Sequence, residues 1–445
     1  MSSLILPSSN LKTGINLTLE KGDGIYVYDN QGNQYLEGMA GLWCTSLGYN
    51  NQELIDAATN QLHNLSYSHM FGGKSHDIGT ELAEKLTAMV PIENAHVFFG
   101  NSGSDANDTQ IKLLHYYFHA IGKPEKRKII ARKRSYHGIT VASACLTGLE
   151  VNHTNFDLPV EALGISHTDA PYYLRDSLPG ETEAQFVDRI VGNLEQQILA
   201  EGPDTVAAFI AEPITGASGV IIPPAGYYEK VQALLKKYDI FFWADEVICG
   251  FGRTGNDFGS TTMDIKPDMM SLAKQLSSAY MPISAAVIRG DMYEAMIEPS
   301  NELGVFGHGY TYSAHPVACA VALKTLQIYE RDNIFAKAAE TGDYLQSQLQ
   351  QYTDHPLVGE VRGRGLIGAI DLHNKAKGEA FPAAVSYHLA KACQDQGLIL
   401  RAVGGTAIAF CPPLIITTAQ IDEMMEKFAK AIAVTEAYVK AEGLM

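Results

Sequence analysis

Short apolar runs alternate with amphipathic stretches through the middle of the chain. The runs have the length of buried strands, and the stretches between them carry apolar residues at helical spacing. Strands that alternate with helices form mostly parallel sheets with both faces covered. We expect strands at 96–99, 128–131, 206–210, 240–244, 269–273 and 283–288, and helices at 53–62, 78–89, 105–119, 227–238 and 317–329.

The two ends of the chain follow a different pattern. Residues 24–37 combine strand formers with an Asp-Asn-Gln-Gly turn, which predicts a hairpin. The C-terminal part predicts strands within 357–372 and helices at 383–394 and 421–442. These elements have the mixture that is typical of a small α+β unit.

The whole pattern predicts an α/β protein with two domains. The large domain is expected at residues 51–325, with a mostly parallel sheet between helices. The smaller α+β domain is expected at residues 326–445, joined by the N-terminal segment 1–50. The length of 445 residues accommodates both units.

Composition and charge narrow the class of protein. The hydrophobic share of 46% and the charged share of 19% are ordinary for a globular protein, which excludes a disordered chain. The formal net charge of −17 disfavours nucleic acids and anionic membranes as partners. No apolar run reaches the roughly 18 residues of a membrane helix, and the six cysteines form no C-x-x-C pair. We therefore expect a cytoplasmic enzyme with reduced cysteines.

A loop of small residues follows the expected strand at 96–99. Ser102, Gly103 and Ser104 precede a helix, whose free N–H groups make an anion site. The same residues suit a helix cap equally well. The loop is therefore either a cap or a phosphate cradle, and it lacks the G-x-G-x-x-G dinucleotide pattern.

Chemically active side chains follow three other expected strands. Asp245 ends an apolar strand, where ligands of open parallel sheets bind. Lys274 follows another strand, and burial there would lower the pKa of its amine and make it a nucleophile. Tyr136 follows the strand at 128–131, where an aromatic ring can stack on a flat cofactor. The alternatives are a capping carboxylate, a solvated lysine and an ordinary loop aromatic.

Two other chemistries fit poorly. Gly73-Lys74-Ser75 imitates the end of a P-loop, but Ser68 stands where the motif requires glycine. His115 and His119 lie four apart on one helix face, as zinc ligands do, but Tyr116 replaces the glutamate of H-E-x-x-H. We expect no metal site.

Taken together and in order, these motifs resemble the class III aminotransferases, a family of fold type I enzymes that use pyridoxal phosphate. The resemblance covers nearly the whole chain. Its most specific stretch is Asp-Glu-Val-Ile-Cys-Gly-Phe-Gly-Arg-Thr-Gly at 245–255, with Lys274 29 residues after Asp245. The other matching motifs are Asn-Ser-Gly-Ser-Asp-Ala-Asn at 101–107, Tyr-His-Gly at 136–138, Ala-Glu-Pro at 211–213 and Thr-Tyr-Ser at 311–313.

The resemblance implies a role for each motif. Lys274 is the Schiff-base lysine and proton shuttle, and Asp245 keeps the pyridine nitrogen of the cofactor protonated. The other implied cofactor-binding residues are Ser102, Gly103, Ser104, Tyr136, His137, Glu212, Val247 and Thr311. Of these, Thr311 would come from the partner subunit, so the resemblance implies a homodimer with shared sites, or a tetramer.

Further motifs are similar to those of the amine–pyruvate, or omega, transaminases. Leu42, Trp43 and Phe71 would form apolar walls beside Tyr136, with Phe71 reaching across from the other subunit. Arg401 would bind the carboxylate of pyruvate and swing away for an apolar amine. Gly404 and Gly405 are expected to give its loop backbone freedom. For lone residues, a core position for Trp43 and a solvated Arg401 are the alternatives.

The resemblance predicts a ping-pong transamination from a primary amine to a 2-oxo acid, with pyruvate as the expected acceptor. The other class III activities stay open: 4-aminobutyrate, ornithine-type or taurine transamination, and aminomutase chemistry. A non-enzymatic protein that only binds pyridoxal phosphate is disfavoured, because Lys274 and Asp245 are both present.

Overall fold

The computed structural model describes residues 3–375 and 377–445, and its centre is a seven-stranded sheet in the order β4-β10-β9-β8-β7-β5-β6. The pairings β5–β6, β5–β7, β7–β8 and β8–β9 are parallel. The mostly parallel sheet of the predicted fold is thereby confirmed. The strands are β4 (His96–Gly100), β5 (Lys128–Arg132), β6 (Ile165–Thr168), β7 (Val206–Ala211), β8 (Phe241–Asp245), β9 (Met269–Leu272) and β10 (Ser284–Ile288).

Strand β10 departs from that direction. It runs antiparallel to β4 on one side and to β9 on the other. Its apolar sequence suits either direction, because a strand buried on both faces shows no alternation that would reveal its partners. The direction is fixed by the pairing of Ser284 with Gly100, which lies far away in the sequence.

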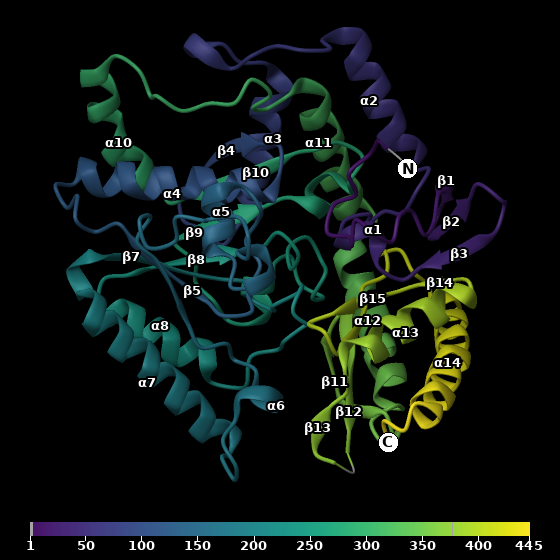
Figure 1. Ribbon diagram of the computed structural model, residues 1–445. Helices are drawn as coiled ribbons and strands as arrows, with labels where there is room; N and C mark the ends of the chain where they lie inside the picture. The colour runs from purple at the N-terminus through teal and green to yellow at the C-terminus, as the bar shows by residue number, and fades with distance from the viewer. Residues whose placement is uncertain (1–2, 376) are drawn as a thin grey trace.

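Both faces of the central sheet are buried. Along β8, Phe242 and Ala244 belong to one apolar core, whereas Phe241 and Trp243 belong to another. Successive side chains of a strand point to opposite faces, so each strand supplies both cores in turn. The helices of this region are α2 (Gln52–Asn64), α3 (Asp77–Met89), α4 (Gly103–Ala120), α5 (Val141–Leu146), α7 (Glu183–Glu201), α8 (Tyr227–Lys237), α10 (Gly290–Leu303) and α11 (Pro316–Arg331) (Figure 1).

The N-terminal hairpin joins a strand from near the C-terminus. The sheet order is β1-β2-β3-β14, and β14 pairs in parallel with β3. This pairing places the start of the chain beside its C-terminal part (Figure 1). The strands are β1 (Leu19–Asp23), β2 (Tyr26–Asp29), β3 (Gln34–Glu37) and β14 (Leu398–Ile399). The division into domains at residues 50 and 325 stays a prediction.

A third sheet lies in the C-terminal part, in the order β11-β12-β16-β15, with β13 paired to β12. Its strands are β11 (Val358–Arg364), β12 (Ile367–Asn374), β13 (Glu379–Ala380), β15 (Arg401–Val403) and β16 (Ala407–Phe410). The longer helices here are α12 (Ile334–Gln350), α13 (Ala383–Asp395) and α14 (Thr418–Ala441), and the short helices elsewhere are α1 (Ala40–Trp43), α6 (Tyr173–Asp176) and α9 (Gly259–Thr262). Within the described residues, no helix combines the length and apolar character needed to cross a bilayer.

The third sheet is fastened to the loop after β8. Leu366 donates its N–H to the carbonyl of Arg253, and buried Arg253 donates back to the carbonyls of Leu366 and Pro412. A Cβ on Gly365 would lie 2.5 Å from the backbone of Thr254, so only glycine fits there. The loop at 250–255, which follows β8, therefore anchors the C-terminal sheet.

Candidate active site

A cavity of about 320 Å³ lies where several strands of the central sheet end at the same edge. Ligands of open α/β sheets bind at such carboxyl ends. Its lining includes most of the predicted site residues: Ser102, Gly103, Ser104, Tyr136, His137, Glu212, Asp245, Val247 and Lys274. A larger hollow of about 1130 Å³ beside α8 contains none of them, so size alone does not identify the site.

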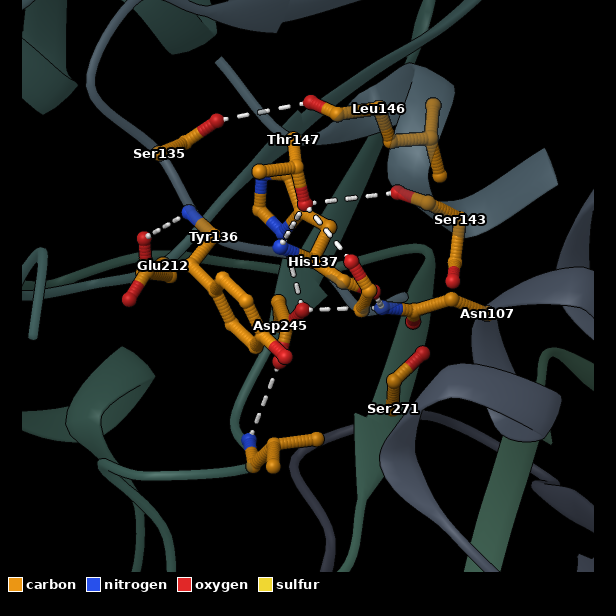
Figure 2. A network of polar contacts seen from close by, with 12 residues as sticks. Asn107, Ser135, Tyr136, His137, Ser143, Leu146, Thr147, Glu212, Asp245 and Ser271 are labelled. Carbon is orange, nitrogen blue, oxygen red and sulfur yellow. Dashed lines mark hydrogen bonds and ion pairs between the residues drawn. The ribbon is translucent and has the colours of Figure 1, made fainter. Parts of the chain in front are cut away.

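Asp245 is buried at the end of β8 and held by three donors. Its Oδ2 accepts from Nδ2 of Asn107 at 3.0 Å and lies 2.8 Å from Nδ1 of His137, while Oδ1 accepts from the N–H of Val247 at 3.2 Å (Figure 2). These three contacts fix the direction of the Asp245 carboxylate in the cavity lining.

Asn107 is a member of this group that our interpretation of the sequence gave no role. Its amide is almost fully buried and donates to Asp245 and to the carbonyl of His137. The signal was its place on α4, three residues after Ser104 and hence on the same face of the helix. Cys44 is a second unpredicted residue, because it lines the cavity beside Lys274.

Glu212 follows β7 and fixes the loop that carries Tyr136. Its Oε1 accepts the N–H of Tyr136 at 3.0 Å (Figure 2). Its Oε2 accepts the N–H of Gly216 at 2.9 Å. Burial raises the pKa of Glu212, and nearby His137 acts in the opposite direction. Tyr136 is thereby placed at the cavity wall by backbone bonds rather than by its own hydroxyl.

The small-residue loop at the start of α4 caps the helix and also leaves N–H groups that could bind a phosphate. Ser102 caps the helix by accepting the N–H of Asp105, and the Asp105 carboxylate accepts the N–H of Ser102. The N–H groups of Gly103 and Ser104 have no acceptor among the described residues. A Cβ on Gly103 would lie 3.1 Å from the Val247 side chain, which lines the same cavity. Two free donors therefore face a tight cradle suited to an anion.

Lys274 stands two residues beyond β9 in a left-handed backbone conformation, with φ of 47°. Such conformations are costly for a residue with a Cβ and cluster at functional sites. Burial lowers the pKa of the Lys274 amine, and the charge of Asp245 opposes that shift. A larger neutral fraction makes the amine a better nucleophile and proton acceptor.

Gln275 has a definite place in this loop. The residue directly follows Lys274 and is fully buried. Its Nε2 donates to the carbonyls of Ile248 at 3.0 Å and Gly250 at 2.7 Å. The lysine loop is thereby tied to the loop that carries Val247.

Arg401 and Trp43 lie beside each other near Tyr136, and neither lines the cavity. The guanidinium of Arg401 is 5.3 Å from the centre of the Trp43 ring, and its own side chain is exposed. Desolvation lowers the pKa of Arg401, whereas the nearby Tyr136 and Tyr387 act in the opposite direction. No carboxylate pairs with Arg401 among the described residues. Trp43 also packs in an apolar cluster with Ile248, which agrees with the alternative prediction that Trp43 is a core residue.

Five predicted residues do not line the cavity in this chain: Leu42, Trp43, Phe71, Thr311 and Arg401. Leu42 and Phe71 are about half exposed, at 50% and 49%, and Thr311 is exposed too. None of them lines the cavity, and the carbonyl of Thr311 accepts from the hydroxyl of Tyr67 at 2.9 Å. The expected contribution of Phe71 and Thr311 from a partner subunit stays a prediction.

Comparison with known proteins gives consistent findings. The family model described as aminotransferase class III matches residues 8–432. Gamma aminobutyrate transaminase 1, mitochondrial, of Solanum lycopersicum is 48% identical over 95% of this chain and 82% of its own length. Vanillin aminotransferase of Capsicum annuum is 46% identical over 95% of this chain and 93% of its own. A crystal structure of the omega transaminase from Pseudomonas jessenii in complex with PMP superimposes with a TM-score of 0.96 at 49% identity, covering 98% and 97%.

Proposed function

The chain belongs to the class III aminotransferase family, and we propose that it transfers the amino group of a primary amine to pyruvate, which gives alanine. It is a transaminase, and its cofactor is pyridoxal 5′-phosphate. Its substrates are therefore an amine and a 2-oxo acid. The choice of pyruvate and the roles of individual residues are the parts proposed here.

The cavity has the donor set that this cofactor needs. Gly103 and Ser104 offer two free N–H groups to the phosphate, and the Asp245 carboxylate suits a protonated ring nitrogen. Tyr136 and Val247 would flank the ring, with Glu212 on the side of its phenolic oxygen. When bound, the cofactor carries the amino group between substrates and stabilises the negative charge left when a proton leaves the substrate carbon.

The protein's own contribution is to hold charges and move protons. Asn107 and His137 hold the Asp245 carboxylate in place in the cavity. The Nζ of Lys274, with its lowered pKa, takes a proton from the substrate carbon and then donates a proton in a later step. The same amine therefore serves first as the base and then as the acid. Gln275 keeps the lysine loop at a fixed distance from the Val247 loop.

The observation that supports an acid substrate is the free cation of Arg401. It stacks over Trp43 near Tyr136 and has no carboxylate partner of its own in the described part of the chain. A guanidinium binds a carboxylate with two parallel hydrogen bonds. Because Arg401 keeps contact with solvent, its side chain has room to turn away when an apolar amine occupies the same place.

A second candidate is 4-aminobutyrate as the amine donor. Several relatives of about 48% identity are named gamma aminobutyrate transaminases, whereas vanillin aminotransferase is named for an aromatic aldehyde. A donor with its own carboxylate would use Arg401 in both half-reactions. An apolar amine would need Arg401 in the acid half-reaction alone.

The test is Arg401→Ala, followed by the absorbance of the bound cofactor in single turnovers. We expect the pyruvate half-reaction to weaken roughly 30-fold, at the lower end of the range of about 2–5 kcal/mol for a paired charge, because Arg401 is solvent-exposed. An apolar amine should react nearly as before, and 4-aminobutyrate should lose as much as pyruvate.

Arg364→Ala removes another exposed arginine and serves as the control. Equal losses for pyruvate and an apolar amine would refute the assignment of Arg401. Comparing pyruvate with 2-oxoglutarate as acceptors of the same amine tests the acceptor, and faster reaction with 2-oxoglutarate would overturn it.

The assembly and location are also proposals. We propose a homodimer whose sites receive Thr311 from the partner, because the loop that carries it is exposed and rich in apolar side chains such as Val305 and Tyr312. The cytoplasm is the proposed location, although some relatives carry the words mitochondrial or chloroplastic in their names.

A further inference from the structure

A buried cluster of charges joins the third sheet to the large central region, away from the cofactor cavity. At its centre is Asp371 of β12, which is fully buried. It accepts from the hydroxyl of Tyr172 and from Nη2 of Arg175, both at the start of α6, and from Nη2 of Arg362 at 3.0 Å. Figure 1 shows α6 beside this sheet.

The cluster continues on both sides of Asp371. The Tyr172 ring lies between two guanidiniums, 4.9 Å from Arg362 and 5.5 Å from Arg134. Arg362 also donates through Nε to the carbonyl of Gly219 at 2.9 Å. Although burial opposes ionisation, Arg362, Tyr172 and Arg175 together lower the pKa of Asp371. The charged carboxylate of Asp371 therefore links the third sheet to the central region through Tyr172 and Arg175. We call this group of residues the clamp.

Asp371 shares a sheet face with Arg401. Asp371 pairs with Ala407, which pairs with Val403, so the three side chains form one row across the strands. Arg401 stands two residues before Val403 and therefore points to the same face. Asp371 of the clamp and the proposed carboxylate-binding arginine thus belong to one rigid surface of three strands.

The turn between β15 and β16 is fastened to the same cluster. Nη2 of Arg175 donates to Oγ1 of Thr406 at 3.2 Å. Gly404 has a φ of 59°, and a Cβ on it would lie 2.1 Å from the carbonyl oxygen of Ser218. Ser218 in turn donates its hydroxyl to the carbonyl of Arg134. Because Arg134 is two residues from Tyr136, one network reaches both walls of the substrate site.

We propose that the Tyr172–Asp371–Arg175 cluster sets the position of Arg401 relative to Tyr136 and thereby tunes the affinity for carboxylate substrates. These are positioning residues, since none of them lines the cavity. The inference rests on the proposed function, because it takes Arg401 to bind the substrate carboxylate.

Tyr172→Phe is the first test, because it removes the bond to Asp371 and keeps the ring between the guanidiniums. We expect the apparent dissociation constant for pyruvate to rise about three- to tenfold, which lies within the roughly 2- to 30-fold effect of residues that act through a packed network. The rate of the half-reaction at saturating pyruvate and the half-reaction with an apolar amine should stay unchanged. Hydrogen exchange of the peptide 398–410 in cofactor-free protein should become faster.

Thr406→Val is a second test, because it removes the bond between Arg175 and Thr406 and leaves the bonds to Asp371 in place. It can be measured if Tyr172→Phe fails to fold. Tyr238→Phe is the matched control, because it removes a tyrosine bond to Glu195 at 2.8 Å in the region of α7 and α8. It should change neither pyruvate affinity nor exchange at 398–410.

The outcomes separate the two proposals. If Arg401→Ala weakens pyruvate binding while Tyr172→Phe and Thr406→Val leave it unchanged, the cluster does not position Arg401. Losses of equal size for pyruvate and the apolar amine in Tyr172→Phe would also overturn the inference, since they indicate general damage. If Arg401→Ala leaves pyruvate binding unchanged, the proposed role of Arg401 is wrong, and the inference about the cluster is wrong with it.

Discussion

At the scale of single residues, the site depends on side chains whose ionisation is set by burial. Lys274 and Asp245 stand at the ends of neighbouring parallel strands; burial lowers the pKa of Lys274, and the charge of Asp245 opposes that shift. Glu37 and Glu246 are buried acids of a different kind, because burial raises the pKa of each to about 7. The first pair supports chemistry, and the second affects how stability depends on pH.

Lys274 is expected to be the lysine that holds the cofactor. Its amine is partly neutral because burial lowers its pKa, and it lines the same cavity as the free N–H groups of Gly103 and Ser104. Borohydride reduction of the loaded enzyme should fix one cofactor per chain on the peptide that contains Lys274. Digestion and mass spectrometry would show it, and a label on Lys133 or any other lysine would contradict the assignment.

Glu37→Gln should change how stability varies with pH. The carboxyl has a pKa of 4.5 when unfolded and about 7 in the fold, where burial outweighs the bond from the N–H of Met39. Its contribution is complete below pH 4.5 and is lost as the pH rises through 7, at up to about 1.4 kcal/mol per pH unit. The glutamine keeps the acceptor and cannot ionise.

Chemical denaturation at pH 5 and pH 7, at one protein concentration, measures this change. The free energy of unfolding should fall about 2 kcal/mol less in Glu37→Gln than in the wild type. Glu84→Gln, at an exposed position, should leave the difference as it is. A pH dependence identical to the wild type in Glu37→Gln would show that Glu37 is ionised in the fold.

At the scale of elements, strand ends and turns decide where the site residues stand. The turn between β15 and β16 contains Gly404 and Gly405, which the sequence suggested as sources of flexibility. Both have left-handed φ values, of 59° and 81°, and Gly404 lies in close contact with Ser218. The glycines are required by the shape of a fastened turn, so Arg401 has its freedom in the side chain rather than in the backbone.

Gly404→Ala and Gly405→Ala form a matched pair that tests this view. Both introduce a Cβ into a left-handed residue, which costs about 1–2 kcal/mol. A Cβ at 404 would also lie 2.1 Å from the Ser218 carbonyl, whereas one at 405 meets open space. We expect Gly404→Ala to lose a further 1–3 kcal/mol or so and to show the lower melting temperature. Equal melting temperatures would contradict a tight contact at 404.

Sequence patterns predicted those elements whose signal is local. Strands such as β7 and β8 are apolar runs, and Asp245 and Lys274 stand out because they follow such runs. Helix α7 went unpredicted although Thr182 and Gln185 form a capping box at its start. This capping box is a local sequence signal that would have indicated the start of the helix.

Other features depend on contacts between distant segments. The antiparallel direction of β10 follows from its pairing with β4, and the role of Asn107 follows from the approach of α4 to β8. The cluster around Asp371 joins residues nearly 200 positions apart. No periodicity along the chain contains such information, because it arises when the sheet and its neighbours pack.

At the scale of the whole molecule, the proposed homodimer would complete each site with residues from two chains. Thr311 is exposed here, and apolar Leu303, Val305 and Tyr312 near it are exposed as well. A surface of this kind is typical of an interface. The shared-site proposal therefore predicts complementation between two inactive chains.

Lys274→Ala and Thr311→Ala chains should restore activity when they are unfolded and refolded together. In a mixed dimer with shared sites, one site carries both defects and the other has none. Half of the dimers are mixed, so up to about a quarter of wild-type activity is expected at limiting cofactor. Thr311→Ser is the control that keeps the hydroxyl. Activity no higher than the sum of the separate samples would place Thr311 in its own chain's site.

The pairing of β4 with β10 has a consequence for folding during synthesis on the ribosome. Gly100 pairs with Ser284, which is made 184 residues later (284 − 100). At roughly 5–20 residues per second, the finished strand β4 waits on the order of 10–40 s for its partner. During that time β4 and the start of α4, where the phosphate is expected to bind, have no sheet to join. During this interval the nascent chain carries an unpaired, apolar strand, a feature that makes folding intermediates prone to aggregation.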